Sequence, residues 1–500
     1  MPSNMSVDSY HPSSHITSTT HYTASQHSHS NRWSALGLLA LAASQGGAYL
    51  GFGLQYALLT PFVLELGVPI RWASIIWLGG PITGMVVQPL VGRLSDGQRN
   101  ESGSGFLQAL SKRFGRRRPF LAFGGFMLVL AQLLVGNSAD LGHLLGDSLT
   151  EESKQTLRIR AVCIFTLGFW LLDASNNTIW VVSKSLTADI VPEVQWPEAF
   201  SVSTGATGLG LALGYVLGGV HWSSRLPWLK TTACNDAGGC ADLRFAFLLA
   251  CVSCVLANLC TLLVGKETAT LLERSQSPEP VREEGAHTPL LEGECRVWKV
   301  LRQNQALGTA YLVTLLAWLG WISLQMYQTE FVAKEVFQGS PDERSPENKA
   351  YVEGVQAASR ALVINALLMT ITTYAIPRAI RSIGKAKLWC LSTLFTALLL
   401  ACSLAIRKDH AKFGASLWLA LLGPVYGVQQ TIPFLVVTEE APKELLGELN
   451  GYLNVALCIP QLMISVLGGS LISLVGSDTL LFGVGALLDL LAAGLCLKYL

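Results

Sequence analysis

The sequence predicts an all-α polytopic membrane protein with twelve transmembrane helices arranged as two six-helix bundles. Half of its 500 residues are hydrophobic, only 14% are charged, and the mean hydropathy is +0.41, well above that of a water-soluble chain. About twelve apolar stretches, each close to the roughly 20 residues that cross a hydrocarbon core, follow one another with short polar breaks. Because no water reaches the backbone inside a bilayer, these stretches must be helices.

The twelve predicted helices follow from the apolar stretches in chain order. They cover residues 34–60, 72–91, 120–135, 161–182, 200–220, 245–264, 306–326, 360–376, 388–406, 416–437, 452–474 and 480–497. A polar, proline-containing segment separates the sixth helix from the seventh and is typical of a linker. We therefore expect a disordered cytosolic N-terminal tail at 1–31, an N-terminal six-helix bundle at 32–265, a cytosolic central loop at 266–304 and a C-terminal six-helix bundle at 305–500.

The charges exclude one class of partner and orient the chain. A formal net charge of +1 gives no overall positive field that would point to nucleic acid as a partner. Lys and Arg gather after the second predicted helix, in the central loop and after the eighth predicted helix. An even number of helices with these loops on the cytosolic side places both termini in the cytosol. We expect a monomer in the lipid bilayer of the plasma membrane, with the vacuolar membrane as the alternative.

Two of the eleven cysteines lie together outside the predicted helices. Cys234 and Cys240, in "TTACNDAGGCADL", fall in a predicted outer loop and would form a disulfide if that side is oxidising; the sequence leaves this open. No Cys or His cluster within the predicted helices has the spacing of a metal site, and HExxH, GxSxG and P-loop motifs are missing. The sequence therefore predicts neither an enzyme nor a bound metal or cofactor.

The fourth predicted helix carries charges that a lipid-facing helix would not keep. In "LLDASNNTIWVVSKSLTADI", residues 171–190, the side chains of Asn177, Trp180 and Lys184 lie within about 40° of Asp173 at 100° per residue. Each ionisable side chain costs roughly 3 kcal/mol at a bilayer centre, so such residues normally face a wet cavity or a partner. Asp173 and Lys184 are roughly 16 Å apart along a straight helix and cannot pair. The stripe predicts the lining of an ion or substrate path.

Asp173 is the predicted proton-coupling residue. Partial burial disfavours the charged form of a carboxyl, which can then bind and release a proton near the pH of a cell surface. Trp180 offers a flat apolar face for a sugar ring, and Asn177 offers both a donor and an acceptor. Asp189 lies about 160° away from Asp173 on the helix and is expected to join an ion pair at the helix end. The alternative is a buried network that only fixes helix packing.

Three other predicted helices carry polar and aromatic stripes. Amide groups and aromatic faces suit a hydroxyl-rich ligand, although any one stripe could instead join helices to each other. Together with the charged stripe, they predict a substrate-binding site. Its expected residues in these helices are Gln45, Tyr49, Gln55 and Tyr56 in the first, Trp321, Gln325 and Gln328 in the seventh, and Asn450 and Asn454 in the eleventh.

A two-part motif follows the second predicted helix. It consists of "GRLSDG" at 92–97 and, after an insertion, "FGRRRP" at 114–119. Asp96, Arg116 and Arg117 can form ion pairs across helix ends in one conformation and lose them in the other, which makes them predicted gating residues. The simpler interpretation is a basic loop that only sets topology. The pattern resembles the loop motif of the major facilitator superfamily.

Longer strings narrow the resemblance to one family. "LLTPFVLELGVPIRW", "LDASNNTIWVVSKSLTAD", "YQTEFVAKEVFQG" and "LNVALCIPQLMISVLGG" are similar to strings of the proton-coupled sucrose and alpha-glucoside transporters of plants and their fungal and animal relatives. The resemblance implies the major facilitator fold and the carriage of a disaccharide, sucrose or maltose, with a proton. It also implies that Asp173 matches an aspartate linked to coupling, and that Lys184, in place of an arginine, contributes to sugar binding or to charge balance.

The segment "YQTEFVAKEVFQG", residues 327–339, departs from the plant pattern. Plant relatives have an acid at the position of Gln328 and an arginine at that of Lys334. Glu330 and Lys334 have the spacing of a favourable pair if the helix continues. We expect Glu330, Lys334 and Glu335, at the outer end of the seventh predicted helix, to act in gating. Because of these departures, fungal relatives that carry maltose and other glucosides are the closer models.

Two functions other than sugar uptake fit the same sequence features. Export of a secondary metabolite is the main competitor among transport functions. A sugar sensor that does not transport would keep the same fold and site, but its usual feature is a long cytosolic domain, and the predicted tails are short. The sequence decides neither the sugar nor the direction of transport.

Overall fold

The structure is a computed structural model, and every regular element in the residues it describes is helical. These residues are 32–68, 76, 78–97, 105–148, 157–220, 222–226, 230–234, 239–267, 290–341, 345–406, 412–475 and 479–499. The predicted tail at 1–31 lies outside them. Six long helices come from the first half of the chain. They are α2 (Ala35–Glu65), α4 (Gly79–Gly97), α6 (Arg118–Gly136), α8 (Ile159–Ile190), α9 (Trp196–Gly218) and α11 (Gly239–Val264).

Six long helices also come from the second half. They are α14 (Gln305–Phe331), α15 (Asn348–Thr373), α17 (Lys385–Cys402), α18 (Lys412–Glu440), α19 (Leu446–Val475) and α20 (Thr479–Tyr499). Short elements join them: α5 (Gly105–Phe114), α7 (Ser138–Leu144), η2 (Glu193–Gln195), α10 (Trp222–Arg225), α13 (Leu290–Gln303), the π-helical turn η4 (Val332–Val336) and α16 (Ile376–Ile383).

The long helices correspond one to one with the twelve predicted helices. Within the described residues, eleven helices are long and apolar enough to cross a membrane, and α4 is the twelfth predicted helix. Helix α4 is less apolar because it continues past the predicted end at residue 91 and includes Arg93 and Asp96. The predicted central loop at 266–304 is also partly wrong as a loop, since α13 forms its last part and buries Val297.

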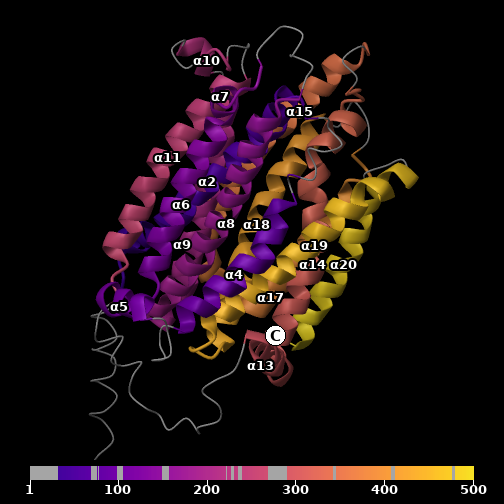
Figure 1. The fold of residues 1–500 in the computed structure, drawn as a ribbon. Coiled ribbons are helices and arrows are strands. Elements are labelled where there is room, and N and C mark those ends of the chain that lie inside the picture. Colours follow the sequence, from indigo (N-terminus) through magenta and orange to yellow (C-terminus); the bar gives the residue numbers. More distant parts are fainter. Residues whose placement is uncertain are drawn as a thin grey trace, which may run out of the picture.

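The two halves repeat one packing pattern. In the first half, α2 packs on α9 and α11, α6 packs on α8 and α11, and α4 packs on α8. In the second half, α14 packs on α19 and α20, α17 packs on α18 and α20, and α15 packs on α18. These are the same pairs by helix order within each half, so the second bundle is an internal repeat of the first (Figure 1).

Two helix pairs make the largest contacts between the halves: α4 packs on α19, and α9 packs on α15. The first contact is close because it is made by glycines. A Cβ at Gly92 would lie 2.2 Å from the carbonyl oxygen of Gly447, and a Cβ at Gly451 would lie 2.6 Å from that of Gln88. Glycines that let helix backbones touch are typical of helix packing in membranes. The halves therefore meet with no side chain between them at this point.

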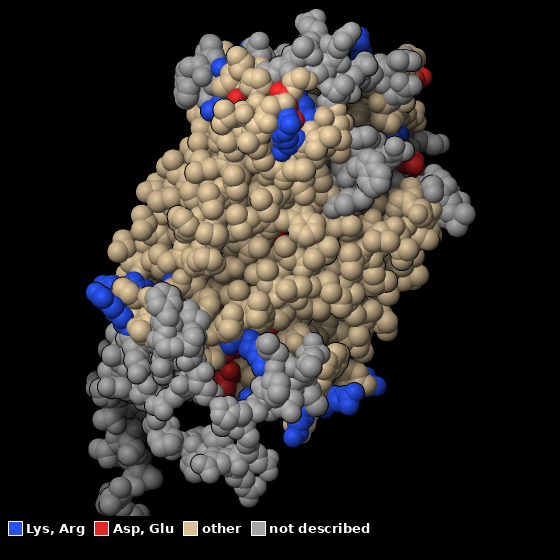
Figure 2. All heavy atoms as spheres, in the orientation of Figure 1, with Lys and Arg blue, Asp and Glu red and all other residues tan. Residues whose placement is uncertain are grey.

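The surface has the charge distribution of a membrane protein. Figure 2 shows that the Lys, Arg, Asp and Glu side chains of the visible face gather at the two ends of the bundle, and that the middle is almost free of them. Exposed hydrophobic side chains within the long helices include Leu167 of α8, Val255 of α11 and Leu487 of α20. One end carries α5, α13 and the C-terminus and is called the basic end here; α10 lies at the other end, called the α10 end (Figure 1).

We expect Gly92→Ala to destabilise the fold by about 1–3 kcal/mol, because the new methyl group must push α4 away from the backbone of Gly447. Thermal unfolding of the purified protein in detergent measures this loss. The matched control is Gly97→Ala in the same helix, where a Cβ would have no neighbour within 4 Å. Equal melting temperatures for the two variants would mean that α4 and α19 do not touch at Gly92.

Candidate functional site

A cavity lies between the two halves. It encloses about 820 Å³ of empty space, including the part open to solvent. Helices α2, α4, α8 and α9 form its wall on one side, and α14, α18 and α19 form the wall on the other. Its lining residues are Tyr49, Phe52, Tyr56, Gly80, Asp173, Asn176, Asn177, Trp180, Leu211, Trp318, Ile322, Gln325, Tyr426, Gln430, Asn454, Leu457, Cys458 and Gln461.

Asp173 is the ionisable residue of this lining that has a buried, unpartnered oxygen. Its side chain is 2% exposed, and its Oδ2 has no hydrogen-bond partner in the described part of the chain. Oδ2 faces α4, where a Cβ at Gly80 would lie 3.5 Å from it and 3.8 Å from Nε2 of Gln461. A buried carboxylate without a partner is costly, so this site favours either a bound proton or a ligand that donates hydrogen bonds.

The neighbouring amides of α8 differ in how they are satisfied. Asn177 donates to the carbonyl of Asp173 at 2.9 Å and to Oγ1 of Thr83 at 3.3 Å, and it accepts from Nε2 of Gln88 at 2.7 Å. These bonds fix α8 against α4. Asn176 is buried, and neither of its side-chain polar atoms has a partner in the described residues. Asn176 is therefore free to bind a ligand, whereas Asn177 chiefly holds the wall.

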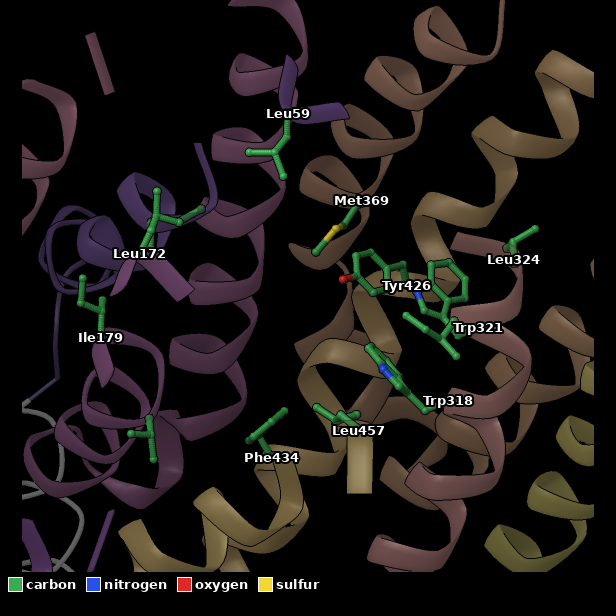
Figure 3. Packing of buried hydrophobic residues seen from close by; sticks show 14 of the residues in the cluster. Leu59, Leu172, Ile179, Trp318, Trp321, Leu324, Met369, Tyr426, Phe434 and Leu457 are labelled. Atoms are coloured by element: carbon green, nitrogen blue, oxygen red, sulfur yellow. The ribbon is translucent and has the colours of Figure 1, made fainter. Parts of the chain in front are cut away.

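Stacked aromatic rings form the wall of the second half. The ring of Tyr426 lies parallel to that of Trp321, with centroids 4.6 Å apart and an interplanar angle of 7°. Nε2 of Gln430 donates to the Tyr426 hydroxyl at 2.8 Å, which fixes the ring a second time. Figure 3 shows Trp318 next to this pair. The cavity thus meets a rigid apolar face with a polar rim.

Helix α2 supplies the opposite aromatic wall. Tyr49 and Phe52 have ring centroids 5.2 Å apart, and Phe52 and Tyr56 are stacked at 6.5 Å. These residues follow the spacing of one helix face, so their rings line the cavity in a row. Aromatic faces on both sides leave a slot suited to flat, partly apolar ring faces.

Lys184 does not line the cavity; it lies further along α8 toward the basic end. Its side chain is 4% exposed, and its Nζ lies 3.1 Å from the ring centroid of Phe434 and 4.5 Å from that of Trp180. No ion pair of Lys184 is present among the described residues. Phe434 belongs to α18 in the other half, so this cation–π contact of about 2 kcal/mol connects the two halves. Trp180 both lines the cavity and covers the ammonium.

Ion pairs lie at the basic end, beyond Lys184. The side chain of Arg117 is fully buried and pairs with Asp96 at 2.5 Å and with Asp189 at 3.0 Å, and it also donates to Ser95. Arg116 binds Asp189 through both Nη2 and Nε, at 2.6 and 3.2 Å. The charged ends of α4, α6 and α8 are thus held by one network, and Asp189 has the ion pair expected from its position on the helix.

The network extends to the other half through Asp96. Oδ2 of Asp96 accepts a hydrogen bond from the backbone N–H of Glu448 at 2.8 Å, in the first turn of α19. A carboxylate at a helix N-terminus satisfies a free N–H and interacts favourably with the helix dipole. Asp96 therefore binds both its own half, through Arg117, and the second half, through α19.

Glu267, just after α11, joins the same region. Its carboxylate accepts from the backbone N–H of Arg117 at 3.0 Å, at the start of α6. Burial raises the pKa of Glu267, and the hydrogen bond from Arg117 and the nearby guanidinium groups oppose part of that rise. The first residues of the central loop are thereby attached to the ion-pair network.

Two surface ion pairs also cross between the halves at the basic end. Arg381 of α16 pairs with Glu198 of α9 at 2.5 Å, and Lys443 pairs with Glu193 at 3.3 Å. Each is exposed and contributes at most about 1 kcal/mol. Together with the α4–α19 contact and Asp96, they close the basic end of the space between the halves.

The α10 end holds the remaining predicted features. Glu330 and Lys334 form the expected pair, both near 40% exposed, although the chain is a π-helical turn from Val332 on. Glu335 is half-buried in the same turn. Cys234 and Cys240 form a disulfide, which the sequence had left open.

The structure brings together only part of the predicted site. Seven predicted residues line the cavity: Asp173, Asn177, Trp180, Tyr49, Tyr56, Gln325 and Asn454. Six do not: Lys184, Gln45, Gln55, Trp321, Gln328 and Asn450. All six are buried, and Gln45, Gln55 and Asn450 each keep at least one amide atom without a partner in the described residues. Most of the six lie about one helical turn from a lining residue of the same helix, and Gln55 directly precedes Tyr56.

The sequence did not predict three lining residues of the second half: Tyr426, Gln430 and Trp318. Tyr426 and Gln430 are four residues apart in "GPVYGVQQTIPF", residues 423–434, so their helical spacing was a signal that the sequence contained. Neither residue is charged, and the pair was not predicted. Gly80 and Leu211 contribute backbone and apolar surface, for which the sequence carries no signal.

Two repeated six-helix bundles, with a central cavity between them and one end closed, define an alternating-access transporter. The chain matches the model of the Major Facilitator Superfamily over residues 102–465. Among solved structures it is similar to the E. coli fucose:proton symporter, with a TM-score of 0.59, 11% identity, and coverage of 93% and 99% of the two chains. It is also similar to the proton:xylose symporter, with a TM-score of 0.59, 14% identity, and coverage of 92% and 95%. At these identities the likeness concerns the fold.

Curated relatives narrow the class. The chain is 32% identical over 457 residues to a sucrose transport protein of Oryza sativa subsp. indica, covering 86% of each chain. It is 30% identical over 558 residues to a sucrose transport protein of Arabidopsis thaliana, covering 97% of this chain and 90% of that one. The chain belongs to the Major Facilitator Superfamily and, within it, to the family of the plant sucrose transport proteins. The predicted family, the predicted fold class and the prediction of a transporter rather than an enzyme are confirmed.

We expect Arg117→Gln to cost about 3–5 kcal/mol in stability, because it leaves the buried carboxylate of Asp96 without its counter-charge. Thermal unfolding in detergent measures the effect. Adding Asp96→Asn to Arg117→Gln should restore part of the loss, since the uncompensated charge is then gone. If the stability losses of the single variants Arg117→Gln and Asp96→Asn simply add in the double variant, the ion pair is not the reason for the burial of Arg117.

We expect the contact between Lys184 and Phe434 to appear as an energetic coupling of about 1–2 kcal/mol. A double-mutant cycle of Lys184→Met and Phe434→Leu, followed by thermal unfolding, measures it. Phe434→Tyr keeps an aromatic face and serves as the matched control, with a smaller loss than Phe434→Leu. A coupling of zero would contradict a cation–π contact between the halves.

Proposed function

We propose that this protein carries sucrose or a related disaccharide such as maltose together with a proton, by alternating access of the cavity between its halves. Its curated relatives are named as sucrose transport proteins, and two of its structural neighbours are named as proton symporters. The observation that carries the proposal is the Asp173 carboxyl, buried at the cavity wall with an unpartnered oxygen. The same position suits a proton and a sugar hydroxyl.

The chemistry of the lining suits a disaccharide. Aromatic rings of α2 and the fixed Tyr426–Trp321 pair offer faces to the apolar sides of sugar rings. Asn176, Gln325, Gln430, Asn454 and Gln461 supply amide donors and acceptors for hydroxyl groups. We assign the first contacts with substrate to these lining residues. Lys184 then acts by supplying a positive charge behind Trp180 rather than by touching the sugar.

Proton binding would control the conformational change through charge. While Asp173 is ionised, moving it into a closed, dry interface between the halves is costly. A proton, together with hydrogen bonds to the sugar, removes that cost and permits closure at the α10 end. The contacts of Asp96, Arg117 and α19 must then separate to open the basic end. In this scheme Asp96, Arg116 and Arg117 are gating residues, and Glu330, Lys334 and Glu335 act at the opposite end.

The proposed orientation places the basic end in the cytosol. The Lys and Arg residues of the second-to-third, sixth-to-seventh and eighth-to-ninth connections support it by the positive-inside rule. Both termini are then cytosolic, and the α10 end with its disulfide faces the oxidising outside. We propose the plasma membrane as the site of action and the monomer as the transporting unit.

The test is uptake of labelled sucrose and maltose into cells that lack their own sugar transport, at two external pH values. One pH unit across the membrane corresponds to ~1.4 kcal/mol and supports about tenfold accumulation with one proton per sugar. We expect the natural protein to accumulate sugar more strongly at the lower external pH, and Asp173→Asn to lose this accumulation because it cannot exchange a proton.

Asp489→Asn is the matched control. Asp489 of α20 is another fully buried carboxyl without hydrogen-bond partners in the described residues, but it does not line the cavity. It should keep the pH dependence if it reaches the cell surface. Uptake that is independent of pH and unaffected by Asp173→Asn would indicate facilitated diffusion. Binding without uptake would indicate a sensor, and efflux of a different compound would indicate an exporter.

A further inference from the structure

Two short helices at the basic end present an aromatic ring beside cations to the surroundings. In α5, Arg113 and Phe114 are exposed, and the Arg113 guanidinium lies 5.3 Å from the centre of the Phe114 ring. In α13, Trp298 is 62% exposed, and Lys299 and Arg302 are exposed next to it. Within the described part of the chain, the three cations form no ion pair. Trp and Phe rings beside Lys and Arg are typical of helices that lie at a membrane interface.

Helix α5 is fixed at the level where membrane-spanning helices end. It ends at Phe114, and α6 begins at Arg118. The Arg118 guanidinium donates to the carbonyl of Phe114 at 3.3 Å and to that of Leu262 at 2.8 Å, in the last turn of α11. Phe114 is thereby held beside the ends of two spans. The interfacial layer of a bilayer, roughly 5–8 Å thick on each side, lies at this level.

Helix α13 is fixed in the same way on α14. It ends at Gln303, and α14 begins at Gln305. Asn304 between them caps α14 through the N–H of Leu307 and donates to Glu440 at the end of α18. Val297 is buried, whereas Trp298 and Arg302, four residues apart on another face of the helix, are exposed.

The charges of α13 are arranged along its length. Glu292 and Glu294 are in its first half, Arg296 is at its middle, and Lys299 and Arg302 are in the half nearest the membrane-spanning α14. Arg296 is near Glu448 of α19, which leaves Lys299 and Arg302 for an outside partner. Figure 1 places α5 and α13 on different sides of the basic end, and Figure 2 shows Lys and Arg gathered at the lower left, around α5.

We propose that α5 and α13 are interfacial helices that bind anionic phospholipid headgroups of the membrane leaflet at the basic end. Trp and Phe rings favour the headgroup level of a bilayer, and Lys and Arg beside them attract lipid phosphate and carboxylate groups. The surface consists of Arg113 and Phe114 on α5 and of Trp298, Lys299 and Arg302 on α13. It is independent of the sugar cavity. Because α5 leads into the Arg116–Arg117 network and α13 leads into α14, bound lipid would restrain both halves at the end that must open.

The first test measures lipid preference. Purified full-length protein is exchanged into mixtures of phosphatidylcholine and phosphatidylserine, and the lipids that stay bound are counted by native mass spectrometry. Each neutralised cation should weaken phosphatidylserine binding about fivefold, which corresponds to ~1 kcal/mol. The variant Arg113→Gln, Lys299→Gln, Arg302→Gln should therefore lose most of the preference. The matched control neutralises Arg160, Arg225 and Lys230 near the α10 end and should keep it.

Equal retention of the two lipids by the natural protein, or an unchanged preference in the Arg113, Lys299 and Arg302 variant, would overturn the proposal. Melting temperatures of the variants show whether any loss comes from unfolding instead. A variant that unfolds is replaced by the single changes Lys299→Gln and Arg302→Gln, each expected to show the fivefold effect.

The second test locates Trp298. Tryptophan fluorescence is compared between the natural protein and Trp298→Phe in vesicles of phosphatidylcholine and phosphatidylserine, and the difference gives the signal of Trp298. We expect this signal to be quenched by lipids brominated near the headgroup and protected from iodide in water. The opposite result, quenching by iodide and not by brominated lipid, would place α13 in the cytosol and refute an interfacial position. Neither readout depends on transport.

Discussion

Burial of the Arg117 guanidinium is the constraint around which the basic end of the molecule is arranged. A fully buried cation needs counter-charges, and Asp96 and Asp189 provide them from two other helices. Asp96 then uses its second oxygen to bind the first turn of α19. The ends of three helices of one half and the start of a helix of the other half are thus fixed together. The glycine contact between α4 and α19 is what brings these groups within reach.

The cavity follows the opposite rule. At the basic end each buried charge has a partner, whereas Oδ2 of Asp173 and both polar atoms of Asn176 have none in the described residues. A buried polar group without a partner is costly, so at the cavity wall these groups favour a ligand that hydrogen-bonds to them. Asp489, Gln45 and Asn450 also have atoms without a partner in the described residues, but they lie outside the lining. It is therefore their place at the cavity, and not the missing partner alone, that makes Asp173 and Asn176 candidate ligand-binding residues.

The sequence predicted the helices and their order because each span is long and apolar. It also indicated which polar residues share a helix face, because a stripe repeats every turn. It could not predict that α4 continues through Asp96, since the charge is tolerated only because Arg117 of another helix reaches it. It also placed Lys184 at the substrate, because helical spacing reveals the face but not that Phe434 of the other half covers the ammonium. Tyr426 was missed for a related reason: its position depends on stacking with Trp321, a contact between helices.

Helix α8 runs unbroken from Ile159 to Ile190 and carries Asp173, Lys184 and Asp189 in turn. Asp173 and Asp189 are separated by roughly 24 Å of continuous helix. An α-helix without proline or a bulge behaves as a stiff rod at this length. In the proposed mechanism, proton exchange at Asp173 and separation of the contacts of Asp189 would then occur at the two ends of one stiff helix. A tilt of this helix would couple the two events directly, with no chain of intermediate residues between them.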